Sequence, residues 1–276
     1  MPTFQPGRHE NGQNFLIDRR VIDDIVALTR DTTGPIVEIG PGDGALTRPL
    51  ARLNRPLTGV EIDPERARRL AAGMPGHVRI VPADFLRHRL PDAPHVVVAN
   101  VPFHLTTAIL RRLLRAPAWT DAILLVQWEV ARRRAGVGGA SMMTAQWAPW
   151  FAFELHRRVP ADAFRPRPSV DGGLLVVRRR TEPLLAGGQR GRFQRLVHAG
   201  FTGPGRGIAD IVARAGLLSG RAASAWAARH GISGRALPRD VPVRAWVDLF
   251  CTTGSSPPAG RVERGRTVGR SRRSPG

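Results

Sequence analysis

The chain has 276 residues, of which 42% are hydrophobic, and its formal net charge is +20. This length suits one large α/β domain with a smaller second one. No apolar run reaches the roughly 18 residues that a membrane span needs. The polar N-terminus lacks the apolar segment of a signal peptide, and a single cysteine, Cys251, excludes an internal disulfide framework. We therefore expect a cytoplasmic, monomeric protein with no membrane partner.

The excess of positive charge indicates a polyanionic partner, with RNA or DNA favoured over a membrane surface. All 42 basic residues are Arg, and the chain contains neither Lys nor Tyr. Single clusters such as Leu110–Arg115 and Ala131–Gly136 are typical of solvated helix ends. Together they predict a surface that binds phosphates without reading sequence.

Short apolar runs alternate with helix-like segments from Pro35 to about Arg180. Strands are predicted at Pro35–Gly40, Leu57–Asp63, Val78–Asp84, His95–Asn100, Asp121–Gln127, Phe151–Val159 and Gly172–Arg180. Helices are predicted at Ala45–Leu53, Pro64–Ala72, Thr106–Leu114 and Trp128–Ala135. Five βα units followed by two strands without a clear helix between them predict an α/β fold. We expect a doubly wound, Rossmann-like sheet of seven strands, mostly parallel with an antiparallel edge.

The composition changes after about Thr181, where apolar residues recur at helical spacing between Gly and Pro. Four helices are predicted at Arg190–Phe201, Gly207–Leu218, Gly220–Ile232 and Val243–Phe250. The last stretch is rich in Gly, Ser, Pro and Arg and cannot form a core, so we expect disorder there. The predicted divisions are a catalytic domain at 1–180, a small all-helical domain at 181–251 and a tail at 252–276.

A Gly-rich turn, "VEIGPGDGALT", lies between the first predicted strand and the helix that follows it. Gly40 and Gly42 allow a sharp turn and a close approach of the backbone to a ligand. Gly40 to Ala45 also satisfy the dinucleotide pattern G-x-G-x-x-A. A pattern of this kind is weak evidence by itself, because a Gly-rich turn need not bind anything.

Three carboxylates at successive strand ends strengthen the prediction that a nucleotide-like ligand binds at this turn. Glu61 follows Gly40 by 21 residues and is placed to bind a ribose diol. Asp84 can accept a hydrogen bond from an adenine amino group while Phe85 packs nearby. Glu38 would repel a pyrophosphate but suits the cationic end of S-adenosylmethionine. Acids on a solvated rim would explain any one of the three, but they explain all three together poorly.

Two functions of other classes remain as alternatives. A nicotinamide-dependent oxidoreductase with a Tyr/Lys site is impossible in a chain that lacks both residues, although a His-based site stays open. A basic RNA-binding scaffold that binds cofactor without turnover also stays open.

The tetrapeptide "NVPF" ends the fourth predicted strand, in line with the carboxylates. The Asn100 side-chain oxygen and a backbone carbonyl near Val101 can accept from the two N–H bonds of an exocyclic amine, and so aim its lone pair at a methyl group. Pro102 stiffens the loop, and Phe103 offers a face on which an extracted base can stack. The alternative is an ordinary turn, since Asn and Pro favour turns.

Six motifs follow one another along the chain: "GQNFL" at Gly12–Leu16, "EIGPGDGALT" at Glu38–Thr47, "VEID" at Val60–Asp63, "ADF" at Ala83–Phe85, "NVPF" at Asn100–Phe103 and "FRPRPSVDG" at Phe164–Gly172. As an ordered set they resemble the rRNA adenine-N6 dimethyltransferases, and within them the erythromycin-resistance (Erm) methyltransferases. The resemblance spans about Gly7 to Phe250.

The resemblance implies S-adenosylmethionine as cofactor and no metal. The residues that it implies for cofactor binding come from the N-terminal segment and the strand ends: Asn14, Leu16, Glu38, Gly40, Gly42, Glu61, Asp84, Phe85 and Asn100. Among them, Gly40 is implied to contact the methionine end, Glu61 the ribose and Asp84 the adenine.

For the substrate, the resemblance implies a flipped adenine in the peptidyl-transferase loop of 23S rRNA. Methylation of its N6 would confer resistance to macrolides, lincosamides and streptogramin B. Asn100, Pro102 and Phe103 are the implied catalytic residues, with Phe103 and Phe164 stacking on the base. The alternative interpretation of Phe164 is a loop anchor packed on the core. The alternative subfamily dimethylates small-subunit rRNA.

Overall fold

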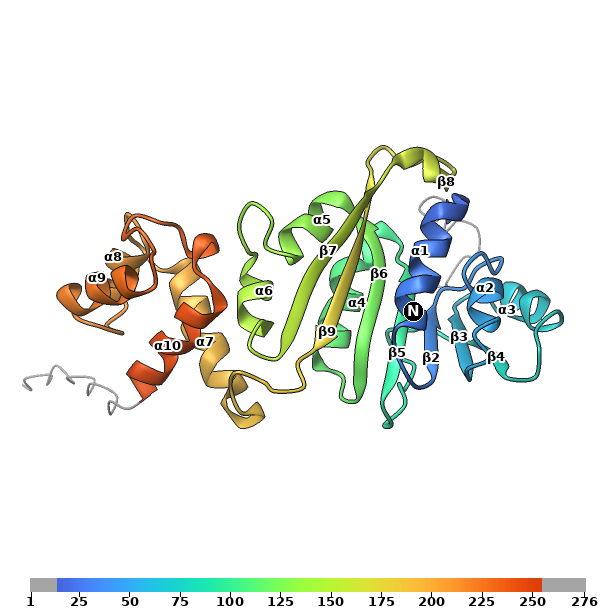
Figure 1. Ribbon diagram of the computed structural model, residues 1–276, viewed down its shortest axis with the longest axis horizontal. Coiled ribbons are helices and arrows are strands. Elements are labelled where there is room, and N and C mark those ends of the chain that lie inside the picture. Colours follow the sequence, from blue (N-terminus) through green and yellow to red (C-terminus); the bar gives the residue numbers. More distant parts are fainter. Residues whose placement is uncertain (1–13, 255–276) are drawn as a thin grey trace, which may run out of the picture.

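The computed structural model describes residues 14–254 and contains a seven-stranded sheet of order β4-β3-β2-β5-β6-β9-β7 (Figure 1). Its strands are β2 (Ile36–Ile39), β3 (Leu57–Glu61), β4 (Val78–Pro82), β5 (His95–Asn100), β6 (Trp119–Gln127), β7 (Phe151–Val159) and β9 (Gly172–Arg179). The first five strands pair in parallel, whereas β9 runs antiparallel to both β6 and β7. The predicted doubly wound α/β sheet is confirmed, and its reversed strand lies one position inside the edge.

Helices cover both faces of this sheet. They are α1 (Arg19–Arg30), α2 (Thr47–Ala51), α3 (Pro64–Ala71), α4 (Thr106–Arg115), α5 (Trp128–Arg134) and α6 (Met142–Trp147). Apolar residues of α1 and α2 pack in one buried cluster with the sheet, and those of α4 pack in a second cluster. The sheet is therefore buried on both sides, which explains why its strands are continuous apolar runs.

Two helices of this layer, α1 and α6, were not predicted. Between β4 and β5, where no helix was predicted, the chain forms turns, so only four of the five expected βα units contain a helix. That segment, which contains Asp84 and Phe85, instead lies along one wall of the cavity described below.

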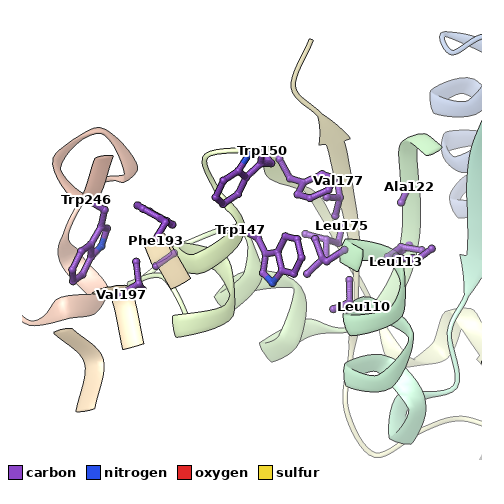
Figure 2. Packing of buried hydrophobic residues seen from close by; sticks show 14 of the residues in the cluster. Leu110, Leu113, Ala122, Trp147, Trp150, Leu175, Val177, Phe193, Val197 and Trp246 are labelled. Carbon is purple, nitrogen blue, oxygen red and sulfur yellow. The ribbon is translucent and has the colours of Figure 1, made fainter. Parts of the chain in front are cut away.

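Four helices follow the sheet: α7 (Arg190–Thr202), α8 (Ile208–Arg214), α9 (Gly220–Arg229) and α10 (Val243–Gly254). They lie beyond the edge strand β7, and their positions match the four predicted segments (Figure 1). The ring of Phe193 lies 5.7 Å from that of Trp150 and 5.6 Å from that of Phe250, measured between centroids. One buried cluster thus runs from the sheet into the helices (Figure 2). The division into two domains near Thr181 stays a prediction.

A separate two-stranded ladder joins the start of the described chain to a distant loop. β1 (Phe15–Leu16) pairs antiparallel with β8 (Phe164–Arg165). The backbone N–H of Ile17 also donates to the Ala163 carbonyl at 2.8 Å. This ladder fixes the N-terminal segment beside the carboxyl ends of the parallel strands.

Some predictions fall outside the described residues, namely the disorder of the tail beyond Gly254 and the part of the first motif before Asn14. Between Asn14 and Gly254, no helix combines the length and apolarity needed to cross a membrane. The same residues contain no cluster of three His, Cys, Asp or Glu side chains suited to a metal ion.

Candidate active site

A cavity of about 510 Å³ opens at the carboxyl ends of β2, β3 and β5. Such edges are where open α/β sheets bind their ligands. Every residue predicted to bind the cofactor lines it: Asn14, Leu16, Glu38, Gly40, Gly42, Glu61, Asp84, Phe85 and Asn100. Pro102 and Phe103 line it as well. The fold thus gathers these predicted residues around one space, while the individual roles given to them stay predictions.

Glu61 and the Gly-rich turn form one hydrogen-bonded unit. The Glu61 carboxylate is 3% exposed and accepts from the backbone N–H of Gly42 at 2.9 Å and of Asp63 at 3.0 Å. Gly42 has φ +54°, and a Cβ there would lie 3.3 Å from the Phe15 ring. Each carboxylate oxygen therefore keeps acceptor capacity for a ligand hydroxyl, and a side chain at position 42 would strain the backbone and press on the Phe15 ring.

Glu38 is the most perturbed acid of the site. It is 1% exposed, and its Oε2 has no hydrogen-bond partner among residues 14–254. Burial, with the charge of Glu61 adding to it, raises the pKa of Glu38 from 4.5 to about 8. A buried acceptor without a donor, in the wall of a cavity, fits a ligand that brings a positive charge or an N–H group.

The adenine end of the predicted cofactor site is supported from α4. The Asp84 Oδ1 accepts from the backbone N–H of Leu86 at 2.8 Å, which holds the turn after β4. Arg112 donates to the carbonyl of Leu86 at 2.8 Å and to that of His88. Its guanidinium also lies over the Phe85 ring, 5.5 Å from the centroid. Arg112 therefore ties the wall that carries Asp84 and Phe85 to the helix that follows "NVPF".

Asn100 has a fixed orientation. Its Nδ2 donates to the backbone carbonyl of Asn14 at 2.8 Å. Because a carbonyl can only accept, the amide nitrogen must face Asn14, and Oδ1 is left as an acceptor at the cavity. The N-terminal segment, held by the ladder between β1 and β8, thus sets the direction of the side chain predicted to hold the target amine.

The aromatic residues beside Asn100 lie in different environments. Phe103 lines the cavity, in a short 3₁₀ turn that begins directly after Pro102. Phe164 does not line it: it is 1% exposed, and its ring packs against that of Phe103 with centroids 6.2 Å apart and planes at 74°. The structure therefore places Phe164 behind Phe103 rather than over the cavity. Its predicted stacking role stays a prediction that requires the ring to leave this position.

Two residues of the site escaped the sequence reasoning. Phe15 lines the cavity against Gly42 and lies under the Arg66 guanidinium, 5.2 Å from the ring centroid. Its position between Asn14 and Leu16, both predicted as contacts, was the available signal. Arg112 gave no signal, since it lies in a cluster typical of a solvated helix end.

The chain matches the family model for the ribosomal RNA adenine dimethylases over residues 5–252. It belongs to this family. Two of its relatives carry related names. The chain is 57% identical over 217 residues to an rRNA adenine N-6-methyltransferase of Corynebacterium diphtheriae, a match that covers 78% of this chain and 86% of that protein. It is 48% identical over 265 residues to the mycinamicin-resistance protein MyrB of Micromonospora griseorubida, a match that covers 94% of this chain and 85% of that protein.

The crystal structure of the 23S rRNA methyltransferase ErmE matches this chain with a TM-score of 0.80 and 36% identity, covering 88% of this chain and all of that one. The resemblance to the Erm group and the methyltransferase fold are thus confirmed. The chain is an S-adenosylmethionine-dependent rRNA adenine methyltransferase. Its cavity fits that cofactor, because the unpaired Glu38 oxygen suits a cation and the Glu61 carboxylate suits a diol.

Proposed function

We propose that the chain methylates N6 of one adenine in the peptidyl-transferase loop of 23S rRNA and so confers resistance to macrolides, lincosamides and streptogramin B. The observation that carries the chemistry is the orientation of Asn100, whose Nδ2 donates to the Asn14 carbonyl and leaves Oδ1 as an acceptor at the cavity. The choice of RNA is supported by the likeness to a 23S rRNA methyltransferase, and the resistance by the likeness to a mycinamicin-resistance protein.

In this proposal the protein acts by position rather than by strong acid–base chemistry. The Asn100 Oδ1 and a backbone carbonyl near Val101–Pro102 accept from the two N–H bonds of the target amine. These two acceptors turn the nitrogen lone pair out of conjugation with the ring and toward the cofactor. Phe103 stacks on the extracted adenine and offsets part of the free energy of leaving the RNA stack.

Different residues of the cavity bind different parts of the cofactor. Bound S-adenosylmethionine supplies an electrophilic methyl group. Glu61 binds the ribose diol and Asp84 the adenine amino group, while Gly40 and Gly42 bring the backbone close to the methionine end. Glu38, in its ionised form, balances positive charge. Pro102 keeps the loop rigid, so Asn100 and Phe103 hold their relative positions.

RNA reaches this site across a strongly basic surface, since the net charge of +20 favours binding of phosphates. We also propose that the protein acts as a cytoplasmic monomer. Residues 1–180 form the catalytic domain and 181–251 a small helical domain. The selection of one adenine then depends on RNA shape and local single-strandedness rather than on the charge.

Transfer of label from methyl-labelled S-adenosylmethionine tests the proposal. Protein-free 23S rRNA and small ribosomal subunits are incubated in parallel with the wild type and with Asn100→Ala. We expect label on 23S rRNA alone, and its loss in the variant with cofactor affinity retained. Label on the small subunit alone would move the chain to the sister subfamily. Activity that survives the Asn100 substitution would refute the proposed mechanism.

A further inference from the structure

A second pocket, of about 590 Å³, lies at the carboxyl end of β6, outside the cavity described above. The residues that define its character are Gln127, Trp128, Arg158, Arg167, Val170 and Asp171. None of them has a role in the site proposed so far. We call it the β6 pocket.

A fixed cation–aromatic pair forms one wall of the β6 pocket. The guanidinium of Arg158 lies over the Trp128 ring, 5.1 Å from its centroid. Its Nε donates to Asp171 Oδ2 at 2.7 Å, and Asp171 Oδ1 accepts from the backbone N–H of Ala161 at 2.9 Å. The Arg158 side chain nevertheless stays 60% exposed. Trp128 and Asp171 therefore hold the guanidinium plane of Arg158 in place, while part of this plane faces solvent.

The rest of the pocket adds positive charge and apolar surface. Arg167 lines the pocket beside Asp171, whose pKa its charge helps to lower, and so adds positive charge to the pocket. Glu129, the second acid of the lining, already accepts from Arg132 at 2.9 Å. Val170 is 44% exposed and adds apolar surface to the lining. The pocket thus combines a stacking plane, a cation and an apolar patch.

Strand register places the β6 pocket next to the catalytic cavity. Asn100 pairs with Leu125 of β6, and Gln127 follows two residues later at the same edge of the sheet. Gln127 pairs with Gly172 of β9, against which the Phe164 ring packs. Phe164 in turn contacts Phe103. The two hollows are therefore neighbours along one edge, separated by this pair of Phe rings.

We propose that the β6 pocket binds a nucleotide that flanks the target adenine in the RNA chain. Guanidinium planes and aromatic rings stack on unpaired bases, so Arg158 supported by Trp128 offers a platform for the neighbouring base. Arg167 binds a phosphate of the same nucleotide. This inference rests on the proposed function, since it takes the RNA around the target adenine as the ligand. Under this proposal, the RNA next to the target adenine is recognised by residues that contact neither the cofactor nor the reacting amine.

Site-directed crosslinking tests this assignment. A hairpin RNA with the peptidyl-transferase loop sequence carries 4-thiouridine at one position flanking the target adenine, on either side in turn. It is irradiated with the full chain and S-adenosylhomocysteine, and the crosslinked peptide is mapped by mass spectrometry. We expect a crosslink from one flanking position to Trp128 or to the segment 167–171. Crosslinks from both positions that map only elsewhere would overturn the inference.

Substitution gives an independent readout. Arg158→Gln and Arg167→Gln should each raise KM for the hairpin about tenfold, with the Kd for S-adenosylmethionine unchanged. Arg30→Gln removes the same charge from an exposed position at the end of α1 and should change KM less than twofold. Pocket variants that behave like this control would contradict the inference.

The two proposals fail in distinguishable ways. If the wild-type chain methylates the hairpin but the predicted crosslink is absent, the proposed function is retained and the assignment of the β6 pocket as a nucleotide-binding site is refuted. A crosslink at the β6 pocket without methylation of the hairpin leaves RNA binding there and contradicts the proposed 23S substrate.

Discussion

The replacement of Glu38 by Gln should remove a pH dependence of cofactor binding. The wild-type carboxyl is 1% exposed, and burial raises its pKa from 4.5 to about 8. At pH 6 about one molecule in a hundred then has Glu38 ionised, and at pH 7 about one in eleven. If the cationic cofactor binds the ionised form, its Kd should fall about tenfold between pH 6 and pH 7. Glu38→Gln retains the shape but cannot titrate, so its Kd should stay constant.

Isothermal titration calorimetry with S-adenosylmethionine measures both effects. In buffers of different ionisation enthalpy, the wild type should release about 0.9 proton per cofactor bound at pH 7, and the variant should release none. A wild-type Kd that is the same at pH 6 and pH 7 would refute the assignment. A variant with the wild-type pH dependence would show that another group titrates.

The same pKa shift predicts how the stability of the ligand-free protein depends on pH. A carboxyl whose folded pKa is raised binds more protons in the folded state, so its contribution is present below pH 4.5 and is lost as pH rises toward 8. Relative to the wild type, Glu38→Gln should gain about 3 kcal/mol of unfolding free energy between pH 4.5 and pH 7. Urea denaturation at the two pH values measures this difference. A constant difference would contradict the raised pKa.

Three further substitutions test other parts of the site. Arg112→Met should raise KM for S-adenosylmethionine about tenfold with kcat little changed, because the turn at Phe85 loses its hydrogen bonds to α4; a fall in kcat alone would contradict this. Phe103→Ala should lower kcat/KM for RNA about 5- to 160-fold at unchanged cofactor affinity, since stacking contributes about 1–3 kcal/mol per base; an unchanged kcat/KM in steady-state assays would exclude stacking. Gly42→Ala should destabilise the protein by about 1–2 kcal/mol in urea denaturation, because φ is +54° and the new Cβ lies 3.3 Å from Phe15; wild-type stability would mean that the turn relaxes freely.

The sheet was predictable because its signals are local. The middle of "HVVVAN" is wholly apolar because β5 lies between β2 and β6 with helices on both faces. The strand ends then brought Glu38, Glu61 and Asp84 to one cavity, as the rule for open α/β sheets requires. Helix α1, which was not among the predicted helices, also has a local signal, since Asp18 caps an amphipathic segment.

The contacts that orient the site were beyond sequence reasoning. The ladder between β1 and β8 has only two residues in each strand, and its partners lie about 150 positions apart, so no periodicity reveals it. The hydrogen bond from Asn100 to the Asn14 carbonyl depends on that ladder and on a backbone group that every residue carries. The burial of Phe164 behind Phe103 depends on its packing against Gly172, and the motif Phe164–Gly172 contains both residues without showing that contact.

The position of the transferred methyl group tests the central claim most directly. 23S rRNA is methylated by the wild-type chain in vitro, digested with a sequence-specific ribonuclease and analysed by mass spectrometry. The account predicts N6-methylated adenosine in a single fragment, at one adenine of the peptidyl-transferase loop, and no modified fragment with Asn100→Ala. A methyl group on another base, or at adenines outside that loop, would contradict it.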